Sequence, residues 1–332
     1  MPVYYDIHSI LTVRSEYPPE TLSKVLPPYF ITSGASAEKC TDLSIHSLSR
    51  LPRIPSEVEG AVVLSRGFLG SGLMVENLEG RARVYLASLR YRVVRKLRPK
   101  ILRLLFEILE VKLLQKGFTF VHAGCIAHGD EGVMLLAPPN TGKTLTVLWL
   151  VLEKKLLFLA DDMCVLGPNA RALSYPIPLT IHYKHTQVLK GLFSSRLSLS
   201  LRVRKYLSKL LLGKLLSSCQ EVPPEVIFPQ HYFAKECRVS KLVFLELSQM
   251  RRVERVRDET IMWRKLVTTA KMHRTHYDTP LLLYFFHRPF IDVTELEERQ
   301  NELLRSLLDR TEWYLVKGPP DTFAELVARL LE

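Results

Sequence analysis

The feature that most constrains this fold is the segment Ala137-Pro138-Pro139-Asn140-Thr141-Gly142-Lys143-Thr144. An apolar run, 132–136, precedes it, and a second apolar run of helical character, 145–152, follows it. The order of strand, tight loop and helix is typical of an α/β fold with a phosphate-binding loop. Unpaired N–H groups at the start of a helix, reinforced by the helix dipole, attract anions. We therefore expect a nucleotide site at this loop, with an ordinary surface loop as the alternative.

The eight residues of the loop divide into N–H donors and residues that shape the entrance. Pro138 and Pro139 lack an N–H, so Asn140, Thr141, Gly142, Lys143 and Thr144 supply the amides. Ala137 stands where the usual pattern has glycine, and alanine tolerates a positive φ poorly, so the entrance is expected to differ in shape. Lys143 is expected to reach the β- and γ-phosphates of ATP, and the Thr144 hydroxyl to ligate Mg²⁺.

Two carboxylates follow the next apolar run. Residues 156–160 predict a strand, and Asp161 and Asp162 come directly after it. Ligands of open α/β sheets bind beyond the carboxyl ends of strands, so this pair is expected near the loop. One carboxylate can hold Mg²⁺ while the other accepts a proton from an attacking hydroxyl. Mutual repulsion is expected to raise one pKa. The alternative is a turn or a helix N-cap, where Asp is common.

A histidine precedes the loop by one predicted hairpin. Residues 118–121 read as a strand, and residues 125–136 predict two strands joined by a turn at 129–132. His122 then lies at a strand end near the phosphate site. Its alternative interpretation is a structural hydrogen-bonding residue.

These elements together resemble the catalytic domain of the HPr kinase/phosphorylase family. The matching segments are Val121-His122-Ala123-Gly124, the 137–144 loop and Ala160-Asp161-Asp162, with Tyr175-Pro176 as a further similarity. The resemblance implies that Asp161 is the general base, that Asp162 is associated with the metal, and that His122 lies beside the base. The family's Glu-Ile-Arg-Gly-Leu-Gly signature has no counterpart here, so the resemblance implies a kinase without naming its acceptor.

The length of 332 residues and a hydrophobic content of 47% are sufficient for two domains with sizeable cores. We expect a β-rich N-terminal domain over 1–96 and, over 97–332, a P-loop nucleotide-binding domain in which helices flank a mixed sheet. Other expected helices are 97–116, 262–269, 295–308 and 321–331, with a helical excursion over 186–222. Other expected strands are 61–64, 81–86, 241–247, 281–286 and 313–316.

Charge and cysteine usage limit the partners and the compartment. The formal net charge is +12, with basic residues concentrated at 81–116 and 196–214. Such segments suit nucleic acid or phosphorylated partners, but few aromatic residues are interleaved, which makes nucleic acid the less favoured partner. Arg171, Lys184 and Arg288 are further candidates for neutralising phosphates. The five cysteines are scattered, no apolar run is long enough to span a membrane, and a cytoplasmic location is expected.

The sequence thus predicts an ATP- and Mg²⁺-dependent kinase that phosphorylates a hydroxyl of a protein serine or a small metabolite. Two alternatives remain open: a nucleotide-gated binding module with little turnover, and an ATPase stimulated by a partner protein. The acceptor is not identified, and both a monomer and an oligomer are compatible with the sequence.

Overall fold

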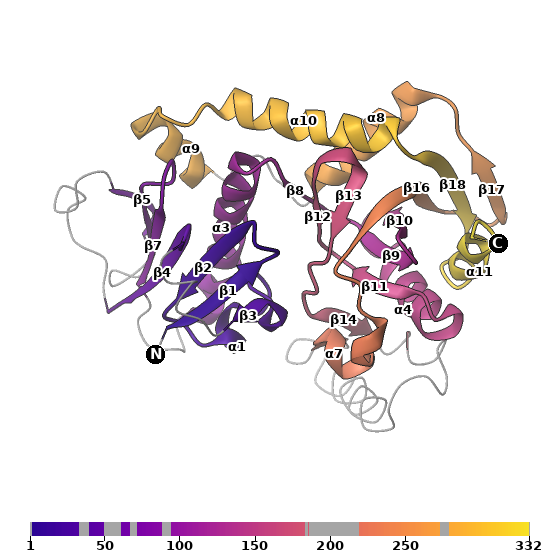
Figure 1. The fold of residues 1–332 in the computed structure, drawn as a ribbon, viewed down its shortest axis with the longest axis horizontal. Helices are drawn as coiled ribbons and strands as arrows, with labels where there is room; N and C mark the ends of the chain where they lie inside the picture. Colours follow the sequence, from indigo (N-terminus) through magenta and orange to yellow (C-terminus); the bar gives the residue numbers. More distant parts are fainter. Residues whose placement is uncertain are drawn as a thin grey trace. The chain divides into compact units, whose positions relative to one another are not determined.

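The computed structural model describes residues 2–32, 40–49, 61–66, 72–87, 94–182, 185, 219–272 and 279–331. Within these residues the chain forms two compact units, 1–120 with 273–302 and 121–272 with 303–332 (Figure 1). The expected division at residue 96 differs from this boundary, because the helix that follows residue 93 belongs to the first unit. The assignment of 97–332 to a single nucleotide-binding domain stays a prediction.

The first unit is built on a mixed sheet. Its described part has seven strands in the order β3-β1-β2-β4-β7-β6-β5. The pairs β2–β4 and β4–β7 are parallel, and the others are antiparallel. The strands are β1 (Val3–Ile7), β2 (Leu11–Ser15), β3 (Ile31–Thr32), β4 (Leu43–Leu48), β5 (Ala61–Arg66), β6 (Gly72–Glu76) and β7 (Ala82–Ala87).

The helices of the first unit include α1 (Pro19–Leu22), α3 (Val94–Gln115) and α9 (Thr279–His287), while α10 (Val293–Asp309) continues into the second unit. The predicted helix over 97–116 is α3. It ends before Gly117, whose φ of +79° suits a residue without a side chain. Two of its polar side chains are buried and paired: Lys112 donates to the carbonyl of Gly80, and Glu110 accepts from the Thr119 hydroxyl.

The second unit is a nine-stranded sheet among the described residues. Its main path runs β11-β9-β10-β16-β13-β12-β8, β18 also pairs with β16, and β17 pairs with β18. The strands are β8 (Thr119–Val121), β9 (Gly124–His128), β10 (Glu131–Leu136), β11 (Leu157–Ala160), β12 (Cys164–Leu166), β13 (Arg171–Leu173), β16 (Glu236–Leu247), β17 (Arg252–Arg255) and β18 (Glu312–Gly318). A separate pair joins β14 (Leu179–His182) to β15 (Cys219–Val222).

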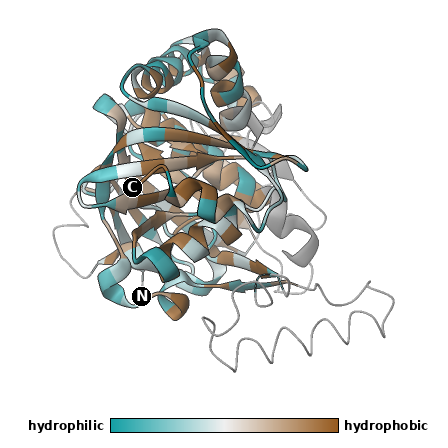
Figure 2. Cartoon of the chain, turned by 90° about the vertical axis from the view of Figure 1, so that its right-hand side faces the viewer, coloured by the Kyte–Doolittle hydropathy of each residue, from teal (hydrophilic) through white to brown (hydrophobic). Residues whose placement is uncertain are grey.

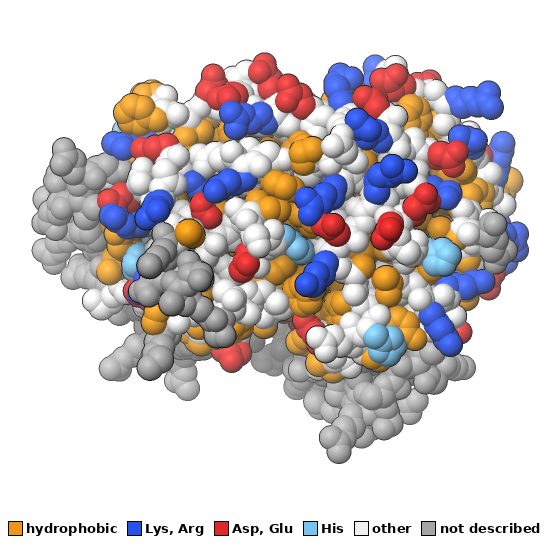
Figure 3. Space-filling model, viewed as in Figure 1, with side chains coloured by type: hydrophobic (Ala, Val, Ile, Leu, Met, Phe, Trp, Pro, Cys, Tyr) orange, Lys and Arg blue, Asp and Glu red, His pale blue; other side chains and the backbone are white. Residues whose placement is uncertain are grey.

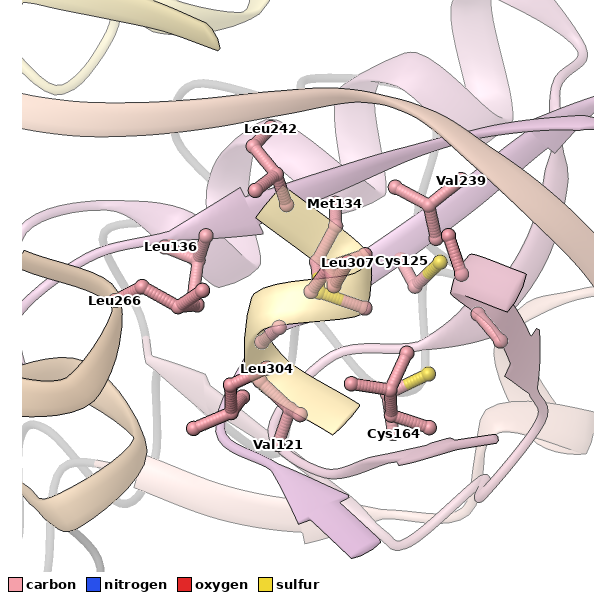
Figure 4. Packing of buried hydrophobic residues seen from close by; sticks show 14 of the residues in the cluster. Val121, Cys125, Met134, Leu136, Cys164, Val239, Leu242, Leu266, Leu304 and Leu307 are labelled. Carbon is pink, nitrogen blue, oxygen red and sulfur yellow. The ribbon is translucent and has the colours of Figure 1, made fainter. Parts of the chain in front are cut away.

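Helices cover both faces of this sheet. One apolar cluster joins the sheet to α8 (Glu259–Met272) and to the leucines of α10 between 303 and 308 (Figure 4). The other joins it to α4 (Lys143–Lys154) and α11 (Phe323–Ala328), which lie next to one another in Figure 1. A short helix, α7 (Pro224–Ile227), follows β15. In Figure 2 the strands carry mostly apolar residues, as expected for a sheet buried on both faces. The mixed α/β class predicted from the sequence is confirmed.

One predicted strand is a helix. Residues 281–286 were expected to form a buried strand because they are an unbroken apolar run, but they lie within α9. A short apolar run does not distinguish a strand from a helix by periodicity. The helix buries Leu281, Tyr284 and Phe285 and exposes Leu282, Leu283 and Phe286, so the period is that of a helix. Most of the expected excursion over 186–222 lies outside the described residues; its described end is β15.

A glycine in β10 makes room for a cysteine of β16. A Cβ on Gly132 would overlap the Sγ of Cys237, which lies 4.0 Å from the Sγ of Cys125. Cys125 belongs to β9, on the far side of β10, so the Cys237 side chain reaches over the strand at its glycine.

We predict that Gly132→Ala lowers the free energy of unfolding by about 1–3 kcal/mol, because overpacking a filled core forces neighbours to move. Chemical denaturation checks this value. In a Cys237→Ala background the same change should cost at least about 1 kcal/mol less, since the overlapping sulfur is gone. An equal cost in both backgrounds contradicts the steric explanation.

Candidate functional site

The loop between β10 and α4 has an unstrained entrance. Ala137 is buried and does not have a positive φ; the left-handed residues are Asn140, with φ of +63°, and Gly142, with φ of +117°. The backbone of Ala137 is thus not strained. Whether this alanine changes the shape of the loop entrance stays a prediction. Pro138, Pro139 and Asn140 are exposed, and the Thr141 hydroxyl closes the turn by donating to the Pro138 carbonyl at 2.8 Å.

Gly142 is held from outside the loop by a segment that follows β18. A Cβ on Gly142 would lie 3.0 Å from the Cβ of Pro320 and 3.4 Å from its Cα. The turn that carries Pro320 is itself fixed, because the Thr322 hydroxyl donates to the Pro319 carbonyl at 2.8 Å. Glycine is therefore required at 142 both for its φ and for this close approach. Nothing in the local sequence indicates the contact with Pro320.

The strand directions explain why the loop and the two aspartates meet. β10, β16 and β18 are parallel, and β11 points the same way because it is antiparallel to β9, which is antiparallel to β10. Their carboxyl ends share one edge of the sheet, where α/β folds bind ligands. Residues 137–142 follow β10, and Asp161 follows β11. His122 precedes β9, whose reversed direction brings its amino end to the same edge.

Lys143 is buried between two of the predicted partners. Its Nζ lies 3.2 Å from Oδ1 of Asp162 and 3.1 Å from Nε2 of His122. His122 Nδ1 lies 2.7 Å from the Asp162 carbonyl, which can only accept, so Nδ1 carries a proton and Nε2 accepts from Lys143. The side chain of Lys143 is 7% exposed and that of Asp162 is 46% exposed. The lysine is thus fixed in place, while its counterion remains accessible to solvent.

Asp161 is the buried member of the pair. It is 4% exposed, its Oδ2 accepts from the Thr144 hydroxyl at 2.7 Å, and its Oδ1 has no hydrogen-bond partner. Burial raises the pKa of Asp161 to about 6; the Asp162 carboxylate adds to this shift, while Lys143 and the Thr144 hydroxyl oppose it. A carboxyl group with a pKa near 6 is deprotonated at neutral pH yet basic enough to accept a proton.

The raised pKa makes a prediction about stability. The folded protein retains a proton on Asp161 over a pH range in which the unfolded chain has lost it, so rising pH weakens folding in that range. In metal-free buffer, we expect the stability difference between wild type and Asp161→Asn to shift in favour of the variant from about pH 4 to about pH 6, by roughly 2–3 kcal/mol in total. Urea unfolding of both proteins at several pH values measures this difference. A difference that does not change with pH contradicts the burial argument.

Of the other predicted cations, Arg171 lies away from this edge. Arg171 forms an ion pair with Glu236 and pairs in register with Arg238 at the amino end of β16, so it lies at the opposite edge of the sheet. Arg288 belongs to the first unit and pairs with Glu79 at 2.8 Å. Lys184 lies outside the described residues. On the face drawn in Figure 3, basic and acidic side chains are interspersed rather than separated.

Gly124 has a steric role at the site that the sequence motifs did not indicate. A Cβ there would lie 2.7 Å from Cγ2 of Val147, 3.4 Å from Cγ of Lys143 and 3.6 Å from the Asp161 carbonyl. Because Gly124 has no side chain, α4 can approach β9. The start of α4, with Lys143, and the backbone of Asp161 both lie close to this glycine. A glycine two residues after His122, at the start of β9, is the signal that could have indicated this contact.

The oxygen atoms at the site suit Mg²⁺ bound together with phosphate. Among the described residues, no three His, Cys, Asp or Glu side chains are arranged to hold an ion by themselves. Mg²⁺ with a nucleotide commonly takes only one or two protein oxygens, the rest being phosphate and water. The Thr144 hydroxyl and the two carboxylates are such donors, and the unpartnered Oδ1 of Asp161 leaves one of them with unused capacity. From the sequence, Thr144 and Asp162 were expected to hold the metal together. In the structure, the Thr144 hydroxyl contacts Asp161.

Comparison with known proteins yields little. No family model and no curated protein matches the sequence. Among solved structures, the Hpr(Ser) kinase/phosphatase from Coxiella burnetii is similar over 51% of this chain and 99% of its own, with 12% identity and a TM-score of 0.24. A TM-score this low supports no inference, so the site is interpreted from its own geometry. Within the described residues, no helix is both long and apolar enough to cross a membrane.

Proposed function

We propose that the second unit binds ATP at the 137–144 loop and transfers its terminal phosphoryl group to a hydroxyl of an acceptor. One observation carries the proposal: Lys143 and Thr144 of the loop contact Asp162 and Asp161, at 3.2 Å and 2.7 Å. Phosphoryl transfer to a hydroxyl uses donors that hold the phosphates and a group that can accept the hydroxyl proton; the proposal assigns these parts to the 137–144 loop and to Asp161, and the hydrogen bond between Thr144 and Asp161 supports it.

Each residue has a distinct part in this proposal. The amides of Asn140, Gly142, Lys143 and Thr144 and the Lys143 ammonium hold the phosphates and offset their charge, while the Thr141 N–H donates to the Pro138 carbonyl at 3.4 Å. His122 keeps Lys143 in position by accepting its hydrogen bond. Asp161 takes the proton of the acceptor hydroxyl as the new bond from oxygen to the γ-phosphorus forms and the bond to the leaving nucleoside diphosphate breaks.

Mg²⁺, when bound, supplies positive charge beside the phosphate oxygens. Of the protein oxygens at the site, the Thr144 hydroxyl and the carboxylate of Asp162 are the proposed ligands. The Asp162 side chain is half exposed, so it has room to turn toward a metal once phosphate replaces it as the partner of Lys143. Asp161 also accepts a hydrogen bond from the Thr144 hydroxyl. The alternative arrangement is therefore one in which both aspartates hold the metal.

The test begins with calorimetric titration of ATP with and without Mg²⁺, followed by incubation with γ-labelled ATP. Label should move to a hydroxylated small molecule or a serine-containing peptide from a panel of acceptors. Failure to bind ATP even at millimolar concentration with Mg²⁺ overturns the proposal. Binding without transfer or hydrolysis favours the nucleotide-gated module, and hydrolysis that rises only with an added protein favours the partner-stimulated ATPase.

A further inference from the structure

Exposed apolar side chains lie at the same sheet edge as the candidate site, beyond β16 and β18. Leu247, the last residue of β16, is 60% exposed, and Met250 is 71% exposed. Pro320 is exposed as well, and it contacts Gly142 of the phosphate loop. We name Leu247, Met250 and Pro320 the apolar ledge.

The backbone keeps the parts of the apolar ledge together. Leu247 pairs in register with Gly318, and the N–H of Ser248 donates to the Gly318 carbonyl at 3.1 Å. β18 lies between β16 and β17, so residues 248–251 must cross its carboxyl end. The turn at 318–322, which carries Pro320, starts at that same end. The crossing segment and the turn therefore form one surface next to the phosphate loop.

The order of the strands places the carboxylates and the apolar ledge on opposite sides of β10. β11 and β9, which supply Asp161 and His122, lie on one side of β10, and β16 and β18 lie on the other. If the terminal phosphate faces the carboxylates, the nucleoside extends away from them, toward β16 and β18. That direction leads from Gly142 to Pro320.

We infer that the apolar ledge is the nucleoside-binding surface of the site; this inference rests on the proposed function. A nucleobase offers two flat, largely apolar faces, and covering such a face with leucine, methionine and proline removes apolar surface from water on both sides. Methionine adapts to rings of different shape. Binding of the base depends on apolar contact rather than on hydrogen bonds to its edge. The ledge therefore accepts different purine bases without a strict preference among them.

The experiment compares ATP with tripolyphosphate, which carries the phosphates but no nucleoside. In wild type with Mg²⁺, ATP should bind more tightly than tripolyphosphate. In the double variant Leu247→Ser/Met250→Ser, ATP affinity should fall about 5- to 20-fold, as expected for truncating apolar contacts, while tripolyphosphate affinity stays unchanged. Val226→Ser is the matched control, because Val226 is 69% exposed in the same unit but belongs to α7. Thermal unfolding confirms that the variants are folded.

The outcomes separate this inference from the proposed function. If wild type binds both ligands equally well, or if the double variant binds ATP as wild type does, the ledge contacts no nucleoside and the phosphate site stands. If the double variant loses affinity for ATP and for tripolyphosphate equally, Leu247 and Met250 maintain the structure of the phosphate loop instead of contacting the nucleoside. That result also overturns the inference. If wild type binds neither ligand, the proposed function fails, and the inference fails with it.

Discussion

Replacing Asp161 by asparagine should lower phosphoryl transfer by roughly 10²- to 10⁴-fold, the usual contribution of a general base, while ATP still binds. Asparagine keeps the size of the side chain and an oxygen that can accept from the Thr144 hydroxyl, but it cannot take a proton at neutral pH. The loss should therefore appear in kcat and leave ATP affinity within a few-fold of wild type. Single-turnover transfer and calorimetry on the same preparation measure both quantities.

Two further variants make this result specific. Asp130→Asn changes a carboxylate in the exposed turn between β9 and β10, at the opposite edge of the sheet, and should leave transfer unchanged. Asp162→Asn should chiefly raise the Mg²⁺ concentration needed for activity, since its carboxylate is the proposed metal ligand. If Asp161→Asn changes the Mg²⁺ requirement and Asp162→Asn abolishes transfer, the two roles are reversed. Full transfer by Asp161→Asn would falsify its assignment as the base.

Replacing Lys143 by methionine should weaken binding of Mg-ATP and reduce transfer together, by roughly 10²- to 10³-fold in transfer, as for loss of a preorganised cationic donor. Methionine has a similar length and suits a buried position, so the change removes the ammonium with little change in packing. Of the two partners left behind, Asp162 is half exposed and can be solvated, while Nε2 of the buried His122 loses its donor, which costs about 1–3 kcal/mol of stability. ATP titration and transfer assays check both effects.

Lys154→Met is the matched control for this variant, because Lys154 lies on the same helix, α4, and is exposed. It should bind and transfer as wild type does. Lys143→Met should also unfold within a few degrees of wild type, which separates a functional loss from misfolding. Unchanged ATP affinity in a folded Lys143→Met protein contradicts the placement of the phosphates at this loop.

The central part of the sheet and the meeting of Lys143 with Asp162 were predictable because local signals determine them. Apolar runs, a glycine-containing loop and a pair of aspartates each mark the end of a strand, and parallel strands bring those ends to one edge. Ala137 was expected to change the shape of the loop entrance, and this stays a prediction; its φ is not positive, and the left-handed residues of the loop are Asn140 and Gly142. A motif fixes the spacing of residues, but each φ is decided by the turn that forms.

Features that depend on distant segments were not predictable. The contact of Pro320 with Gly142 joins residues far apart in the chain, as does the passage of Cys237 over Gly132. Residues 281–286 were assigned to a strand because hydrophobicity alone does not reveal which face another element covers. The chain leaves the first unit after residue 120, returns to it for 273–302 and then completes the second unit, and composition contains no signal for such a return.

Because Asp162 forms an ion pair with Lys143, any anion that binds the lysine must displace this carboxylate. Chloride or acetate offers the lysine a single negative charge in place of the one it already has, so the exchange yields little. A polyvalent anion brings more charge than it displaces and can also reach the amides of the loop. The pocket should thus select ligands by valence as well as by shape, and monovalent salts should be poor inhibitors of nucleotide binding beyond their effect on ionic strength. Titrations at constant ionic strength in chloride and in sulfate measure this selectivity, and equal inhibition by the two salts would contradict it.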